Sequence, residues 1–153
     1  WPNNLIVKGV TSFSDAQRIQ KLGVDAIYVS NHGGRQLDSV PASIDILPYI
    51  RRAVGPDYPL IMDSGVRSGE DILKALVLGA NFVMLGRPIM FALGAGGAHG
   101  LDSLIEGLKY DLSTGMAQIG LKAIADACPN NLAETDIFLP SVSQERPDFK
   151  GYL

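Results

Sequence analysis

The sequence has 153 residues, of which 46% are hydrophobic and 19% are charged. This composition predicts a globular domain with one core and excludes a disordered chain, which would be poorer in apolar residues. The 13 basic and 16 acidic residues give a net charge of −3, and no stripe of Lys and Arg is present to neutralise phosphates, so nucleic-acid binding is not expected.

Four apolar runs predict four strands, in chain order at residues 5–10, 26–31, 60–63 and 82–85. Each run is continuously apolar rather than alternating. This pattern is typical of strands that are buried on both faces of a parallel sheet.

Stretches with helical spacing separate these runs. Apolar residues predict helices over about 13–22 and 44–54, although Pro48 interrupts the second pattern. Ser68 is a plausible N-cap for a third helix that ends near Gly79. A fourth helix is expected from about 101 to 119, after a flexible Gly-rich connection at 94–98.

The order β-α-β-α-β-α-β-α indicates an α/β fold, either an open doubly wound sheet or a (β/α) barrel. A full (β/α)8 barrel has eight units and about 250 residues, so in a barrel this chain would supply four of the units. We expect one domain over residues 1–128 and an extended tail over 129–153, which is rich in Pro and polar residues.

Polar residues gather where each predicted strand ends. Lys8 ends the first run, and Ser30, His32 and Arg35 follow the second. The third leads into residues 63–67 and the fourth into Gly86 and Arg87. Because the carboxyl ends of parallel strands share one edge of the sheet, these side chains are expected to line one cleft.

His32 and Arg35 suggest chemistry next to a carboxylate. Histidine is the natural general base near neutral pH, and arginine can clamp a carboxylate with two hydrogen bonds. Taken singly, His32 is more often structural and Lys8 more often a surface residue. Their convergence at one edge favours the functional interpretation.

Arg67 and Arg87 suggest a phosphate site in the loops after the last two strands, a common arrangement in (β/α)8 barrels. Surface salt bridging is the alternative. Asp63 would suit a hydroxyl better than a phosphate. ATP and dinucleotide fingerprints are absent, and Met84, Met90 and Met116 suggest core filling.

Other classes of site are not expected. The single cysteine, Cys128, excludes an intramolecular disulfide and a multi-Cys metal site, and it fits a reducing compartment. We expect no bound metal. No apolar run approaches the roughly 18 residues of a membrane span.

Residues 30–38 (SNHGGRQLD) resemble the signature of the FMN-dependent α-hydroxy-acid oxidases and dehydrogenases. This family includes glycolate oxidase, lactate oxidase, mandelate dehydrogenase and flavocytochrome b2. The resemblance extends from residue 5 to about 120. It includes VKG at 7–9, DSGVR at 63–67, KAL at 74–76 and LGRP at 85–88.

The resemblance implies a (β/α)8 TIM barrel of which this chain is the C-terminal half, with FMN as cofactor. Lys8 would contact flavin N1/O2, and Ser30 the flavin or its ribityl chain. His32 would be the base and Arg35 the substrate clamp. Asp63 would bind ribityl hydroxyls. The full set of implied cofactor residues is Lys8, Ser30, Asp63, Ser64, Gly65, Val66, Arg67, Gly86 and Arg87, of which Gly65, Arg67, Gly86 and Arg87 would hold the phosphate.

The implied reaction converts an (S)-2-hydroxy acid of the lactate, glycolate or mandelate type into the 2-oxo acid. His32 would remove a proton while two electrons pass to flavin N5. A non-catalytic half-barrel that keeps only FMN and phosphate binding is the alternative. The pair of His32 and Arg35 argues against a third interpretation, an FMN barrel such as type 2 isopentenyl-diphosphate isomerase.

The resemblance also implies partners. An N-terminal half-barrel, in the same or a companion chain, would complete the site, and the assembly would be a homo-oligomer such as a tetramer. Without that half, the chain is expected to be unstable or oligomeric. The expected location is the cytoplasm, with peripheral membrane association if the enzyme is a quinone-linked dehydrogenase.

Overall fold

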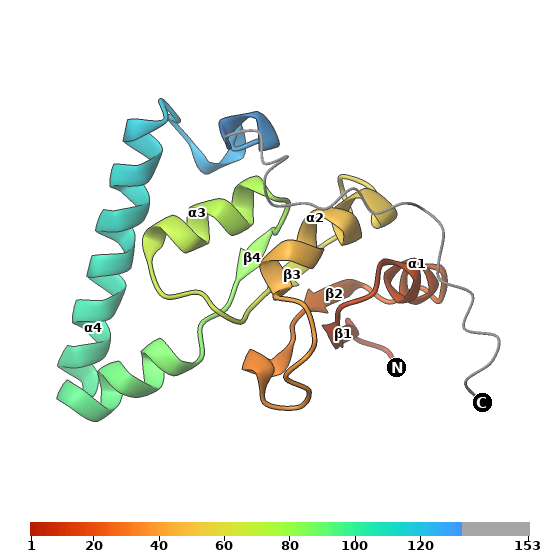
Figure 1. Cartoon of the computed structure of the whole chain (residues 1–153), viewed down its shortest axis with the longest axis horizontal. Coiled ribbons are helices and arrows are strands. Elements are labelled where there is room, and N and C mark those ends of the chain that lie inside the picture. The colour runs from red at the N-terminus through yellow and green to blue at the C-terminus, as the bar shows by residue number, and fades with distance from the viewer. Residues whose placement is uncertain (133–153) are drawn as a thin grey trace.

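Four parallel strands form one sheet in the order β1-β2-β3-β4 in the computed structural model, which describes residues 1–132 (Figure 1). The strands are β1 (Ile6–Val10), β2 (Ala26–Val29), β3 (Leu60–Met62) and β4 (Phe82–Val83). Each strand pairs with the next strand along the chain. The predicted order of alternating strands and helices is confirmed.

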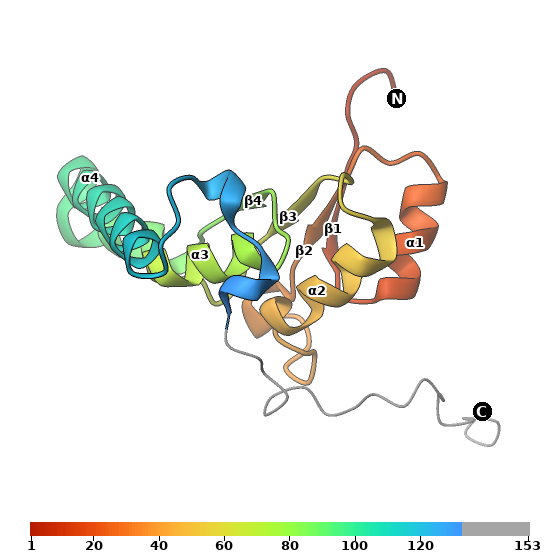
Figure 2. The ribbon, with the colours of Figure 1, turned by 90° about the horizontal axis from the view of Figure 1, so that it is seen from above.

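A helix follows each strand. The helices are α1 (Phe13–Lys21), α2 (Ser43–Val54), α3 (Gly69–Val77) and α4 (Arg87–Gln118). Figure 2 shows α1, α2 and α3 along one side of the sheet, with α4 beyond α3 at the β4 end. Three short 3-10 turns complete the described chain: η1 (His32–Gly34), η2 (Ile124–Asp126) and η3 (Pro129–Asn131).

Local sequence signals set the helix starts. The Ser12 hydroxyl accepts a hydrogen bond from the backbone N–H of Asp15 at the start of α1. Ser68 and Asp71 form a reciprocal capping box at the start of α3, as the Ser68 N-cap predicts. Pro48 lies inside α2, which therefore continues through it with one backbone hydrogen bond fewer.

The core lies between the sheet and helices α1–α3. Its largest fully buried apolar side chains come from β2, α2 and β3, and they are Ile27, Val29, Leu47, Ile50, Leu60 and Met62. Alternation along β2 and β3 sends their four residues in this set to the helix side and the intervening residues to the other face.

No helix among residues 1–132 covers that other face. Lys8, Tyr28, Ile61 and Phe82 are register partners across the four strands, so they form one row on this face. Phe82 is 59% exposed, and Ile6 is 49% exposed. The expectation of strands buried on both faces therefore holds only for the helix side in the described residues.

Arg51 fastens the edge of the sheet opposite the strand carboxyl ends. Its guanidinium donates to the carbonyl oxygens of Gly55, Tyr58 and Gly79 and to the side-chain oxygen of Asn81, at 2.7–2.9 Å. These contacts join the end of α2 to the turns before β3 and β4. The burial of this group lowers the pKa of Arg51.

The Gly-rich segment 94–98 contains the break between two helical segments of α4, at the non-helical backbone of Gly96 and Gly97. A connection was expected here, but the first helical segment, which starts at Arg87, was not predicted. Gly97 has φ 55°, which a glycine adopts without a steric penalty. A Cβ on Gly100 would collide with the carbonyl oxygen of Ala92, so the two helical segments meet tightly at this corner.

The predicted tail, 129–153, lies mostly outside the described residues, and its first three residues form η3. Within residues 1–132, no helix combines the length and the apolar character that a membrane crossing requires.

Candidate active site

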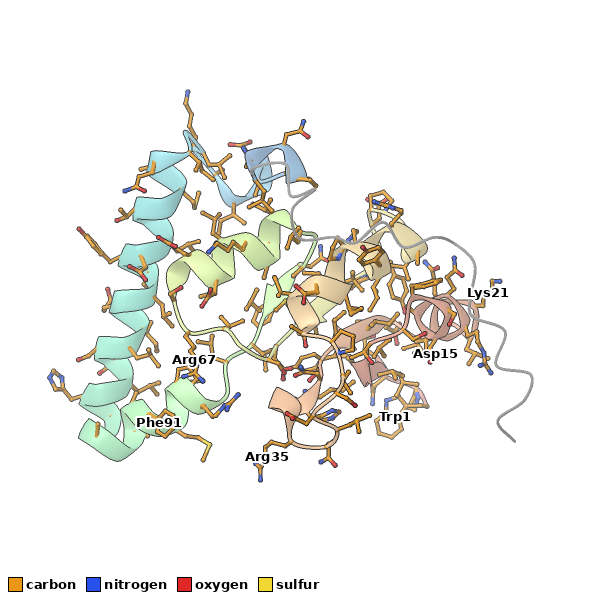
Figure 3. All side chains as sticks on the ribbon, viewed as in Figure 1. Trp1, Asp15, Lys21, Arg35, Arg67 and Phe91 are labelled. Carbon is orange, nitrogen blue, oxygen red and sulfur yellow. The ribbon has the colours of Figure 1, made fainter. Side chains whose placement is uncertain are left out.

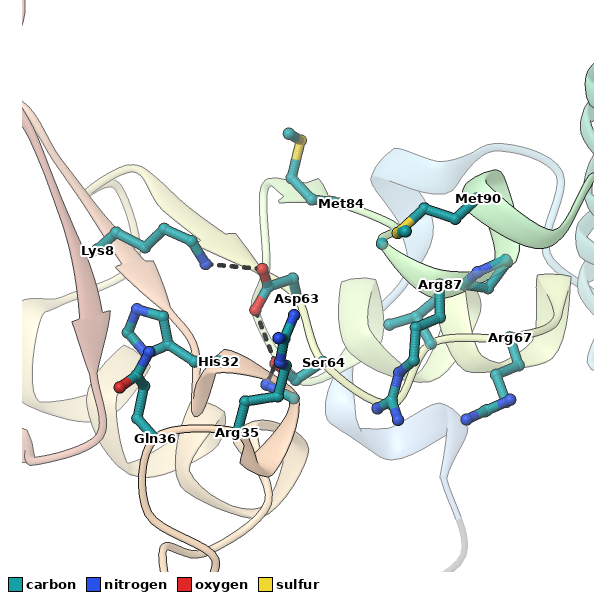
Figure 4. Close-up of a pocket in the computed structure, with 15 residues that line it drawn as sticks. Lys8, His32, Arg35, Gln36, Asp63, Ser64, Arg67, Met84, Arg87 and Met90 are labelled. Atoms are coloured by element: carbon teal, nitrogen blue, oxygen red, sulfur yellow. Dashed lines mark hydrogen bonds and ion pairs between the residues drawn. The ribbon is translucent and has the colours of Figure 1, made fainter. Parts of the chain in front are cut away.

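The carboxyl ends of all four strands open on one pocket of about 810 Å³ (Figure 4). The lining includes every residue singled out at the strand ends except Ser30: Lys8, His32, Arg35, Asp63, Ser64, Gly65, Val66, Arg67, Gly86 and Arg87. The predicted convergence on one cleft is confirmed.

Asp63 is the acceptor at the centre of a polar network. Its Oδ2 atom accepts hydrogen bonds from Lys8 Nζ and Tyr28 Oη, each at 2.8 Å, and its Oδ1 atom accepts one from Ser64 Oγ at 2.8 Å. Burial alone would raise the pKa of Asp63, but hydrogen bonds to the carboxylate outweigh burial and hold this pKa below its ordinary value. Asp63 is therefore a carboxylate at neutral pH.

Lys8 is held from three sides. Besides the ion pair with Asp63, its ammonium donates to Ser30 Oγ at 2.9 Å and lies 4.0 Å from the centroid of the Tyr28 ring. A lysine ammonium has three N–H donors, and these two hydrogen bonds use two of them. One donor is left for a ligand.

Ser30 is fully buried behind the pocket rather than in its lining. Its hydroxyl oxygen accepts from Lys8 and also from the backbone N–H of His32, at 3.1 Å. The predicted contact of Ser30 with a flavin stays a prediction. The contacts in the structure give Ser30 a supporting role for two pocket residues.

The loop after β2 turns through left-handed backbone. His32, Gly33 and Gly34 have φ values of 56°, 67° and 74°. The cost of this conformation at His32, a residue with a side chain, is compensated by hydrogen bonds that fix the loop. The backbone N–H of Gly33 donates to Asn31 Oδ1 and to Ser64 Oγ, both at 3.0 Å.

Gly9 makes room for the His32 imidazole. Gly9 has φ 91° and lies where the pairing of β1 with β2 shifts between Lys8 and Val10, as in a β-bulge. A Cβ at Gly9 would approach His32 Cε1 to 2.6 Å. Only glycine therefore allows the imidazole its present position.

Three arginines at the pocket have no acidic partner among the described residues. Figure 3 shows Arg35 on the loop after β2 and Arg67 on the segment leading into α3. Figure 4 shows Arg67 and Arg87 extending on the same side of the pocket. None of the ion pairs within residues 1–132 involves Arg35, Arg67 or Arg87. The alternative of surface salt bridging for Arg67 and Arg87 is not supported in this part of the chain.

The two helix N-termini at the pocket differ. The start of α3 is occupied, because Asp71 Oδ2 accepts from the backbone N–H groups of Arg67 and Ser68 at 2.9 and 3.1 Å. The start of α4 has Gly86 as its N-cap and no side-chain cap. Pro88 has no N–H, and the N–H of Ile89 donates to the carbonyl oxygen of Gly86. The start of α4 therefore leaves the backbone N–H of Arg87 for an anion, whereas the start of α3 is already satisfied.

Several pocket residues were not expected from the sequence. Met84 and Met90 line the pocket and are 41% and 71% exposed, so the expectation that they fill the core is wrong. Met84 directly follows β4 and Met90 lies in the first turn of α4, among other apolar residues, so the sequence alone does not distinguish them from core positions. Tyr28 could have been found, since it alternates with the buried residues of β2 and so faces the same way as Lys8.

The model of the FMN-dependent dehydrogenase family matches residues 1–134 of this chain. The chain belongs to this family. The match confirms the predicted family and its FMN dependence.

Solved members of the family share the fold. The chain is 48% identical to the lactate oxidase of Pediococcus acidilactici, with a TM-score of 0.78 over 81% of this chain and 34% of that one. It is 42% identical to a soluble mutant of the membrane-associated (S)-mandelate dehydrogenase of Pseudomonas putida, with a TM-score of 0.83 over 87% of this chain and 38% of that one. The predicted fold class, part of a TIM barrel, is confirmed.

Curated relatives are much longer than this chain. The L-lactate oxidase of Lentilactobacillus hilgardii is 47% identical over 122 residues, which are 80% of this chain and 33% of that protein. The chain thus spans about a third of the length of the family members that it matches.

Proposed function

We propose that this chain carries the base, the carboxylate clamp and the phosphate-binding residues of an FMN-dependent oxidation of an (S)-2-hydroxy acid to the 2-oxo acid. The observation that carries the proposal is the gathering of Lys8, His32, Arg35, Arg67 and Arg87 around one pocket. Against the four cationic side chains of Lys8, Arg35, Arg67 and Arg87, the described pocket lining holds a single carboxylate, Asp63. An anionic substrate and an anionic cofactor fit this excess of positive charge.

The substrate end of the pocket is formed by the loop after β2. Arg35 is exposed and free of acidic partners within residues 1–132, so its guanidinium fork is available for a carboxylate. His32 lies three residues earlier, on a loop fixed by hydrogen bonds to Ser30 and Ser64. In this role Arg35 orients the 2-hydroxy acid and His32 takes its proton.

The cofactor end fits FMN. The uncapped start of α4, with Gly86, would hold the phosphate together with the Arg67 and Arg87 side chains. Asp63 has accepted three side-chain donors and can take a ribityl hydroxyl as a fourth. The spare N–H of Lys8 would serve the flavin N1/O2 edge. When bound, FMN accepts the two electrons that the substrate loses.

The test is Arg35→Met in the purified protein that contains this chain. Arg52→Met is the matched control, because Arg52 is an exposed arginine of α2 outside the pocket lining. Loss of a bidentate, charged hydrogen bond should raise the Kd for (S)-lactate about 100-fold, with the Kd for FMN unchanged. The assay is anaerobic bleaching of the flavin as lactate is titrated.

The wild-type titration also decides between activities. FMN that binds but is not bleached by any 2-hydroxy acid would favour the alternative, a half-barrel that binds FMN without catalysis. An unchanged lactate affinity in Arg35→Met would exclude the clamp.

We also propose that a further half-barrel, in the same polypeptide or a companion chain, covers the open sheet face. The exposed apolar residues of that face and the greater length of the relatives support this. The 153-residue chain alone should then aggregate or self-associate in light scattering. A stable monomer would contradict the idea. A tetrameric assembly and a cytoplasmic or peripheral membrane location remain predictions.

A further inference from the structure

The aromatic residue in the middle of the polar network has no role in the function proposed so far. Tyr28 lies on β2, between Lys8 on β1 and Asp63 after β3. It is half-buried and absent from the pocket lining. Its side chain nevertheless contacts both members of the ion pair that faces the pocket.

These two contacts use different parts of the side chain. The hydroxyl donates to Asp63 Oδ2 at 2.8 Å, the same oxygen that receives Lys8 Nζ. The ring face carries the Lys8 ammonium at 4.0 Å from the centroid, a cation–π contact. One rigid side chain therefore sets the position of the cation and of the anion at once.

The chemistry of the pair explains why such a clamp matters. Lys8 is 40% exposed and Asp63 is 20% exposed, so water competes for both groups. A lysine on a flexible four-carbon stem has no preferred position of its own in water. Burial and the Asp63 carboxylate raise the pKa of Tyr28, so the phenol stays a hydrogen-bond donor at any pH of interest.

We propose that Tyr28 is a positioning residue, which holds the Lys8–Asp63 pair so that the one spare N–H of Lys8 is presented to the electron-accepting end of the cofactor. This inference rests on the proposed function for the identity of the ligand. The arrangement of the pair is independent of it. A residue with only a packing role would not need both a hydroxyl on Asp63 and a ring face under Lys8.

The experiment compares three variants of the full protein that contains the chain. Tyr28→Phe removes the hydroxyl and keeps the ring, and Tyr28→Leu removes both. Tyr58→Phe is the matched control, because the Tyr58 hydroxyl is also hydrogen-bonded, to the carbonyl oxygen of Val24, but lies outside the pocket lining. Urea unfolding of all three reports any purely structural effect.

The first readout needs no cofactor. In flavin-free protein labelled with 13C at aspartate carboxyls, the pKa of Asp63 should rise in Tyr28→Phe and in Tyr28→Leu, since the carboxylate loses a donor. Tyr58→Phe should leave it unchanged. An Asp63 titration that is the same in Tyr28→Leu as in the control would overturn the proposal.

The second readout is the midpoint potential of bound FMN, followed by its absorbance. A less well positioned ammonium stabilises the anionic reduced flavin less, so the potential should become more negative in Tyr28→Phe and more so in Tyr28→Leu. Potentials equal to that of Tyr58→Phe would refute a positioning role. If the wild-type protein binds no FMN, the proposed function fails, and the Asp63 titration still decides whether Tyr28 positions the pair.

Discussion

Adding one methyl group at Gly9 should disable the proposed base without touching it chemically. The new Cβ would lie 2.6 Å from His32 Cε1, whereas ordinary van der Waals contact begins near 3.4 Å, so the imidazole must move by about 0.8 Å. Misplacement of a reacting group by about 1 Å can cost about 100-fold in rate, so kcat/KM for a 2-hydroxy acid should fall about 100-fold in Gly9→Ala.

Gly9→Ala also strains the backbone, and a second glycine variant controls for this effect. Alanine in the left-handed region destabilises the folded state by about 1–2 kcal/mol. Gly23 has φ 77°, and a Cβ added there would meet no atom within 4 Å, so Gly23→Ala carries this strain without the clash. Both variants should lose stability in urea unfolding, and only Gly9→Ala should lose activity.

The assay is the rate of anaerobic flavin reduction by (S)-lactate in stopped flow, at saturating FMN. Saturation removes any difference in cofactor affinity between the two variants. Equal rates in Gly9→Ala and Gly23→Ala would refute the reasoning, because the imidazole would then tolerate displacement or would not be the base.

Three further predictions test other parts of the structure. Arg51→Met should lower the free energy of unfolding by about 3 kcal/mol in urea melts, because it leaves several carbonyl groups without their donor, yet it should not change the Kd for FMN. Because the pKa of Asp63 is lower in the folded state than its ordinary value of 3.8, this carboxylate stabilises the folded state above pH 3.8, and the contribution is lost as the pH falls through the folded-state pKa. The free energy of unfolding of Asp63→Asn should therefore depend less on pH below 3.8 than that of the wild type. Equal pH dependence of the two proteins would contradict the network. Arg87→Met should weaken FMN binding about tenfold at low salt and flatten its salt dependence in fluorescence titrations; an unchanged Kd would place the phosphate elsewhere.

The fold was largely predictable from the sequence because its strands are short apolar runs between strong turn signals. The runs at 5–10, 60–63 and 82–85 all contain strands, and Lys8 within β1, Asp63 after β3 and Gly86 after β4 all line the pocket. The sequence could not predict which face of the sheet is exposed, because Ile61 and Phe82 are apolar whether or not another part of the protein packs against them. Their exposure depends on which residues pack against that face of the sheet, and the apolar pattern of a single strand does not carry this information.

The location of the site was predictable from the sequence, but its internal contacts were not. Residue types at strand ends indicated a base, a clamp and an anion site. The pairing of Lys8 with Asp63 joins residues 55 positions apart, and no periodic pattern records it. The close approach of Gly100 to Ala92 at the corner of α4 is likewise a contact that the glycines at 94–98 do not record.

Tyr28 belongs to the row of register partners across the sheet, so the alignment of β2 decides whether Tyr28 reaches the Lys8–Asp63 pair at the pocket. Strand β2 has only four residues, and a slip by one position would turn Tyr28 to the helix side and replace it with an aliphatic neighbour. Lys8 and Asp63 would then face each other without their shared clamp. Molecules with a misaligned second strand would have a damaged cofactor pocket as well as a damaged core, so retention of the yellow flavin during purification should report strand alignment as directly as any measure of stability.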